Sequence, residues 1–75
     1  SFKDAHRQKE IDELIPKLKA EVAALEKALA DPDLYSRDPD AFNAKSARIA
    51  AARAEAETAE MEWLEIEEKR EALAG

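Results

Sequence analysis

The sequence predicts an all-α protein, an antiparallel two-helix coiled-coil hairpin with an irregularity near Pro16. Charged residues occupy 40% of the 75 positions and only one Gly and three Pro interrupt them, which is typical of long helices. Alanine supplies 17 of the 34 hydrophobic residues, so too few large side chains remain for a thick globular core. Two hydrophobic repeats with alternating spacings of three and four flank one Asp-Pro-rich segment. We therefore interpret residues 1–75 as a single hairpin domain.

The first repeat predicts a helix over about residues 4–30. Its apolar residues are spaced by 4, 3, 4, 3 and 4 positions, and they are Ile11, Ile15, Leu18, Val22, Leu25 and Leu29. Pro16 falls inside the repeat and has no backbone N–H to donate, so we expect a kink, a 3₁₀ turn or a restart there. Because the hydrophobic phase continues through Pro16, one bent helix is expected rather than two.

A connector over residues 31–38 separates this helix from a second one, predicted over about residues 39–74. Two Asp-Pro steps in and beside the connector favour turns, and its shortness makes the two helices antiparallel neighbours. Asp38 would cap the second helix, and Pro39 would take its first position. The second repeat comprises Phe42, Lys45, Ile49, Ala52, Ala56, Ala59, Trp63, Ile66, Arg70 and Leu73.

Folding the chain about this connector places large side chains of the first helix opposite alanines of the second. The predicted pairs are Leu29 with Phe42, Val22 with Ile49, Leu18 with Ala52, Ile15 with Ala56 and Ile11 with Ala59. Large-against-small packing lets two helix axes approach closely while the space between them stays filled. Trp63 would then lie opposite the region around Gln8, where its bulk has space.

Few residues in the chain are suited to catalysis or metal binding. There is no Cys for a disulfide or a thiolate metal site, and no apolar run approaches the 18 residues typical of a membrane span, so cytoplasm is the expected compartment. Two packed helices enclose no useful cavity, and we do not expect an enzyme. His6 is interpreted as a surface histidine, and the Glu-rich run from Glu55 to Glu71 as a solvated helix face rather than a cation site.

The net charge of −6 is unevenly distributed along the chain. Residues 55–71 hold eight Glu against Lys69 and Arg70, whereas residues 41–54 hold three basic residues and no acid. The overall acidity argues against strong non-specific binding to nucleic acid. The local asymmetry still allows a directed contact with an anionic partner.

Several motifs resemble the C-terminal domain of the Uup-type ABC-F ATP-binding cassette proteins. The string LADPDLYSRDPDAF at residues 29–42 is similar to the hairpin tip of that domain, and it is the most specific part of the match. The string EWLEIEE at residues 62–68 is similar to the Trp-Leu-Glu-Leu-Glu stretch near the domain's end. Phe2-Lys3-Asp4 resembles its opening, and Ile15-Pro16 the Leu-Pro at which the coiled coil begins. The resemblance covers nearly the whole chain.

The resemblance implies a non-catalytic coiled-coil hairpin that accompanies two ATP-binding cassettes in a parent ATPase. It also implies an association with DNA binding, and the wider family is associated with the ribosome and translation. Phosphate binding by a cassette needs a Gly-rich loop with a Lys, which this chain does not contain. ATP and Mg²⁺ would therefore belong to the cassettes, and no cofactor is expected in the hairpin. We expect a monomeric hairpin with no membrane partner.

Together, the resemblance and the charge asymmetry favour nucleic acid, either DNA or structured ribosomal RNA, as a partner contacted at the tip. The candidate residues are Lys27, Tyr35, Arg37, Lys45, Arg48 and Arg53. Ordinary solubilising charge is the alternative for the basic residues, and Arg53 is spaced to pair with Glu57. Tyr35 either packs over its apolar neighbours or offers a stacking face, whereas the position of Trp63 favours packing. The alternative function is a structural strut or protein-interaction coiled coil without nucleic-acid contact.

Overall fold

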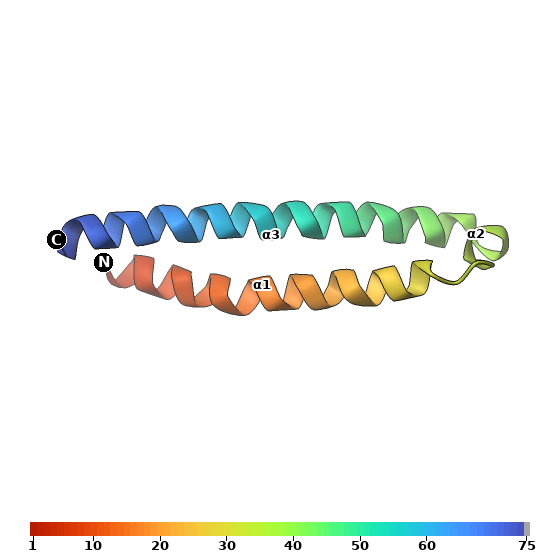
Figure 1. Ribbon diagram of the computed structural model, residues 1–75, viewed down its shortest axis with the longest axis horizontal. Coiled ribbons are helices and arrows are strands. Elements are labelled where there is room, and N and C mark those ends of the chain that lie inside the picture. Colours follow the sequence, from red (N-terminus) through yellow and green to blue (C-terminus); the bar gives the residue numbers. More distant parts are fainter. Residues whose placement is uncertain (75) are drawn as a thin grey trace.

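A computed structural model describes residues 1–74 and shows a slender helical hairpin (Figure 1). The described residues form α1 (Phe2–Leu29), the short α2 (Leu34–Arg37) and α3 (Pro39–Ala74). The rod measures 58 × 15 × 14 Å, with both chain ends at one end of the rod and α2 at the other (Figure 1). The predicted all-α antiparallel hairpin is therefore confirmed.

The long helices begin at residues that satisfy their first free N–H groups. Ser1 caps α1, because its hydroxyl accepts a hydrogen bond from the backbone N–H of Asp4 at 3.3 Å, and α1 begins two residues before its predicted start. Asp38 caps α3 as predicted, since its carboxylate accepts from the backbone N–H of Ala41 at 3.1 Å. Pro39 takes the first position of α3, where a helix has no use for its missing N–H.

Pro16 lies within α1 without interrupting it. The helix is continuous through this residue, so the expected irregularity is neither a 3₁₀ turn nor a restart. Instead, Figure 1 shows α1 as one helix that bows away from α3 in its orange central part. Pro16 is exposed, and a helix that loses a hydrogen bond on its solvent side curves with its convex face toward water.

The core is a single line of contacts between α1 and α3, which we call the seam. Its buried hydrophobic residues are Ile11, Leu18, Val22, Ile49, Ala52 and Ala59. Leu14, Leu25, Leu29 and Ala56 pack against it at half-buried positions. Leu18 and Val22 share one cluster with Ile49 and Ala52, which confirms the predicted large-against-small packing.

The seam differs from the predicted pattern at its margins. Leu34, which precedes both the second repeat and α3, is buried and covers the tip end of the core. At the other end, α3 extends past the start of α1, so the predicted seam residue Leu73 is 75% exposed (Figure 1). Ile15 is only half-buried, because Leu14 takes part in the packing from the adjacent helix position.

Truncation of a seam residue should strongly destabilise the hairpin. Leu18→Ala removes a side chain that is 5% exposed and leaves alanine facing alanine, so the free energy of unfolding should fall by about 2–4 kcal/mol. For a chain of this size the melting temperature should fall by about 10 °C or more, as measured by circular dichroism. Leu73→Ala, at an exposed position, is the control, and a similar small shift for both variants would show that Leu18 does not carry the core.

Candidate nucleic-acid interface

The tip of the hairpin is built on the carboxylate of Asp31. It accepts hydrogen bonds from the backbone N–H of Asp33 at 2.9 Å and from the guanidinium of Arg37 at 3.1 Å. These contacts, the backbone one foremost, hold the pKa of Asp31 below its ordinary value. An Asx turn of this kind starts a helical turn, which explains why the predicted connector contains α2. The tip is therefore an ordered structure.

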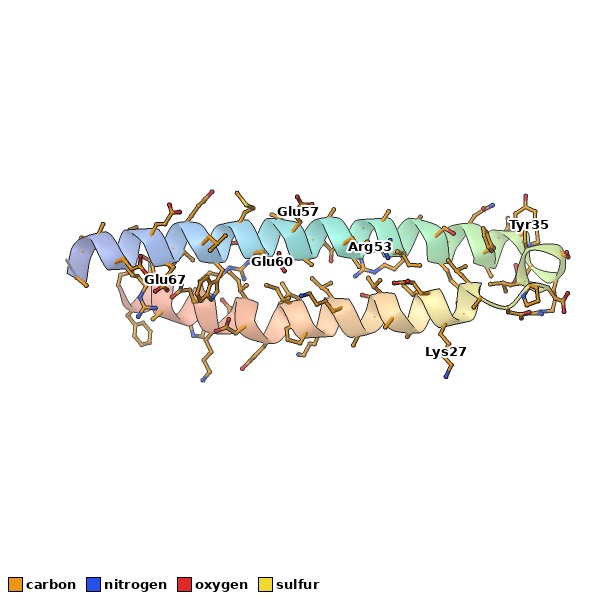
Figure 2. The ribbon with its side chains drawn as sticks, in the orientation of Figure 1. Lys27, Tyr35, Arg53, Glu57, Glu60 and Glu67 are labelled. Carbon is orange, nitrogen blue, oxygen red and sulfur yellow. The ribbon has the colours of Figure 1, made fainter. Side chains whose placement is uncertain are left out.

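Tyr35 projects from this tip while still touching the core. Its ring meets Phe42 edge-on, with ring centroids 5.2 Å apart, yet 57% of the residue is exposed. Figure 2 shows its hydroxyl pointing outward at the end of the hairpin. The two alternatives raised by the sequence are thus compatible, because an edge-on contact holds the ring in place and leaves much of it accessible.

Positive charge lies behind the tip rather than on it. Residues 31–40 carry four Asp against the single basic residue Arg37, which is engaged with Asp31. Lys27 on α1 and Lys45 on α3 follow, and neither forms an ion pair within residues 1–74. Figure 2 shows Lys27 directed away from α3 into solvent, whereas Lys45 is half-buried beside the seam.

The two arginines farther along α3 are bound to carboxylates. Arg48 donates to both oxygens of Glu21 on α1, at 2.6 and 2.7 Å, and to Glu55 on its own helix at 3.1 Å. These contacts raise the pKa of Arg48 and lower that of Glu21. Arg53 pairs with Glu26 across the hairpin at 3.0 Å, rather than with Glu57 as its spacing suggested. Together with Arg37 at the tip, three of the six candidate residues are therefore paired with carboxylates of the hairpin itself.

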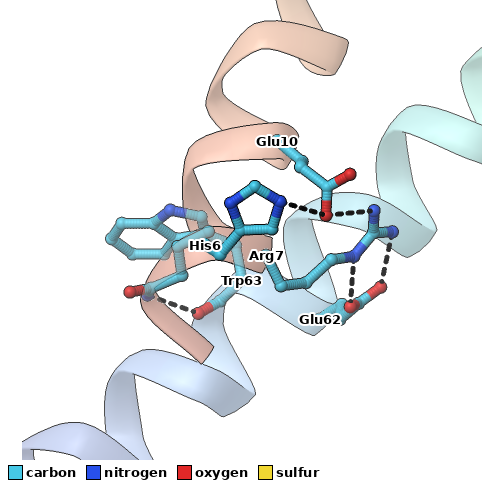
Figure 3. Close-up of polar contacts among 6 residues, drawn as sticks. His6, Arg7, Glu10, Glu62 and Trp63 are labelled. Carbon is cyan, nitrogen blue, oxygen red and sulfur yellow. Dashed lines mark hydrogen bonds and ion pairs between the residues drawn. The ribbon is translucent and has the colours of Figure 1, made fainter. Parts of the chain in front are cut away.

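The opposite end of the rod contains a polar cluster that the sequence did not reveal. Arg7 donates to both oxygens of Glu62, at 2.6 and 3.0 Å, which raises the pKa of Arg7 and lowers that of Glu62 (Figure 3). Gln8 is 4% exposed and donates to the carbonyl of Trp63 at 3.3 Å, confirming that Trp63 lies opposite Gln8. Trp63 is half-buried and packs in the hairpin rather than presenting a stacking face.

The remaining features considered from the sequence are His6, a metal site and a membrane span. The exposed ring of His6 stacks on Phe2 with ring centroids 6.5 Å apart. Among residues 1–74, no group of three or more His, Cys, Asp or Glu side chains is close enough to hold a metal ion. No helix in the same part of the chain is long and apolar enough to cross a membrane. The arrangement at the tip can thus offer two lysines and one aromatic face to a ligand, and little else.

Comparison with known proteins gives consistent matches along the chain. The family model of the ABC transporter C-terminal domain matches residues 1–68. Over all of its 75 residues, the chain is 55% identical to the ATP-binding protein Uup of Caulobacter vibrioides and 31% identical to the ATP-binding protein Uup of Haemophilus influenzae. The chain spans 12% of the length of each of these two relatives. No solved structure matches it significantly.

The ion pair between Arg48 and Glu21 predicts a specific pH dependence of stability. Because Arg48 lowers the pKa of Glu21 in the folded chain below its ordinary value of 4.5, the pair stabilises the fold above that pH. Its contribution is lost as the pH falls through the lowered pKa. Glu21→Gln should therefore lower the melting temperature at neutral pH, and its difference from the wild type should disappear at about pH 2.

The exposed Glu65, which forms no ion pair within residues 1–74, provides the control for this comparison. Glu65→Gln should change the melting temperature little at either pH in the same circular dichroism measurement. An equal destabilisation by Glu21→Gln at both pH values would show that the charge of Glu21 is not what stabilises the hairpin.

Proposed function

This chain belongs to the ABC transporter C-terminal domain family, and we propose that it is the non-catalytic arm with which a Uup-type ATP-binding protein engages nucleic acid. ATP and Mg²⁺ would be bound by the cassettes of the parent protein, and the hairpin would contribute binding alone. The contact would be made with DNA or structured ribosomal RNA by the end of the hairpin that carries Tyr35, Lys27 and Lys45.

The observation that carries this proposal is the separation of charge along the rod. The acid-free residues 41–54 lie near the tip, and the eight Glu of residues 55–71 lie toward the chain ends. Exposed charges interact over a Debye length of about 8 Å at physiological salt, which is short beside the 58 Å rod. The acidic half therefore exerts little repulsion on a nucleic acid that approaches the tip.

The side chains near the tip suit binding that does not depend on the nucleotide sequence. Lysines bind phosphates as point charges, and an exposed aromatic ring accepts any base because every base has a stacking face. Tyr35 is held by Phe42, so little side-chain freedom would be lost on binding. The four Asp of the tip limit the number of phosphates that can approach and favour weak binding, in the micromolar range or poorer.

A second function, a structural strut, is favoured by a different observation. Ion pairs cross from α1 to α3 along the whole rod, from Lys69 with Asp4 at 2.7 Å to Arg53 with Glu26 at 3.0 Å. Charged side chains that are paired in this way stiffen the hairpin and are not available to a ligand. A stiff arm that positions the cassettes would require no nucleic-acid contact.

Reversal of the two available lysines distinguishes the two functions. Lys27→Glu combined with Lys45→Glu should weaken binding to a fluorescently labelled duplex by about tenfold or more, because phosphate contacts carry this kind of affinity. For the wild type, with two lysines available for phosphate contacts, the logarithm of affinity should fall with the logarithm of salt concentration at a slope of about −2. Fluorescence anisotropy across a salt series measures both quantities.

The matched control reverses two exposed charges near the chain ends. Glu65→Lys combined with Glu68→Lys should leave binding unchanged or strengthen it, and circular dichroism should show all variants folded. Absence of binding by the wild type at low salt, or equal binding by the tip variant, would favour the strut.

A further inference from the structure

The two long faces of the hairpin are closed to different degrees. On one face, Arg7 and Arg48 each donate two hydrogen bonds of 2.6–3.0 Å to a carboxylate of the opposite helix. On the other face, the cross-helix contacts are single: Arg53 with Glu26 at 3.0 Å, and Lys19 with Glu60 at 3.8 Å. Exposed single ion pairs contribute little to stability, so the paired side chains on this second face can be displaced at small cost.

The weakly closed face carries a long groove over the seam. One hollow of about 560 Å³ lies over Leu18, Val22, Ala52 and Ala56, of which the first three are buried, and charged side chains make up the rest of its lining. A second hollow of about 310 Å³ continues it toward the chain ends over Ile15, Trp63 and Leu64. Glu60 lines both hollows, so they adjoin. Along α1 the groove runs from Asp12 to Glu26, which is about 20 Å of helix.

The groove has an apolar centre and an acidic rim. Leu64 lines it with 50% of its surface exposed. Of the charged residues that line it, Lys19, Glu26, Arg53 and Glu60 are paired with one another. Asp12 and Glu57 form no ion pair within residues 1–74, so the rim has a net negative charge and two carboxylates available to a partner.

We propose that this groove is a docking site for a basic amphipathic helix from the ATP-binding part of the same parent protein. A helix of about four turns matches the length of the groove, and its apolar face would complete a three-helix packing over Trp63 and Leu64. Lys or Arg side chains beside that face would pair with Asp12 and Glu57. The acidic rim disfavours a nucleic acid or an acidic segment in the same place.

Tethering favours an occupant within the parent protein. The groove lies along the middle of the rod, between the end that holds both chain ends and the tip (Figure 1). In the relatives, the matched segment is 12% of the length, so a large ATP-binding remainder is tethered to it. Tethering raises the effective concentration of a partner into the millimolar range and makes a modest groove sufficient. The inference rests on the family assignment in the proposed function, and it does not require the tip to bind nucleic acid.

Photo-crosslinking in a full-length protein tests the proposal. The Caulobacter vibrioides relative would carry this chain in place of its matched segment, with p-benzoylphenylalanine replacing Leu64 in one variant and Thr58 in another. Thr58 is the matched control, since it lies on the same helix but lines a separate hollow of about 430 Å³ on the opposite face, beside the ion pair of Arg7 with Glu62. Mass spectrometry should identify crosslinks from position 64 to a Lys- or Arg-bearing helix of the ATP-binding part, with few from position 58.

Charge variants test the chemistry of the occupant. Glu57→Lys should reduce the crosslink yield from position 64 by about tenfold, because it replaces attraction with repulsion at the rim. Glu65→Lys makes the same change at an exposed position outside the groove and should leave the yield within about twofold. Circular dichroism of the 75-residue variants checks that both changes leave the hairpin folded.

The proposal is overturned if positions 58 and 64 crosslink equally, if neither does, or if Glu57→Lys has no effect. Crosslinks between two hairpins, with a dimer seen by sedimentation, would instead assign the groove to a second copy. None of these measurements contains nucleic acid, and Lys27→Glu with Lys45→Glu should leave the crosslinks unchanged. Failure of the groove proposal is thus separable from failure of binding at the tip.

Discussion

The thinness of the core is the constraint on which the rest of this structure depends. Two helices can bury only one seam between them, and here two of its six buried hydrophobic residues are alanines, Ala52 and Ala59, which lie opposite larger residues of α1. Alanine brings the helix axes close together, but it contributes little apolar area of its own. Polar contacts across the seam therefore take on a role that a thicker core would fulfil with apolar packing, and this explains the paired arginines on both sides of the rod.

The same constraint explains the polar end of the hairpin. Toward the chain ends the apolar repeat of α1 stops at Ile11, and Gln8 takes the next seam position with almost no exposure. A buried amide is tolerated only when its groups are bonded, and its amide nitrogen reaches both Trp63 and Glu67 while its oxygen accepts from Arg70. Asp4 and Lys69 then close the end at 2.7 Å. The seam thus changes from apolar to polar without losing its register.

The sequence predicts the fold of this chain better than it predicts the candidate site. Seam residues such as Leu18 and Ala52 could be assigned because helical periodicity dictates which residues share a face. The partner of Arg53 could not, because a long side chain reaches several carboxylates and only the relative rotation of the helices selects Glu26 over Glu57. The helical turn of α2 was missed for a similar reason, since it depends on a local contact between the side chain of Asp31 and the backbone of Asp33.

Those cross-helix pairs also change what the basic residues can mean for function. A count of charges over residues 41–54 treats Arg48 and Arg53 as equivalent to Lys45, yet the arginines are already bound to glutamates of α1. An arginine that leaves a two-bond carboxylate contact for a phosphate exchanges one strong partner for another, so the net gain in binding is small. The lysines lose no such partner, and Tyr35 loses none either. The residues that stiffen the arm are thus largely distinct from those that can serve a ligand at the tip, and this division lets one thin rod be stiff along its length and still offer free side chains near its tip.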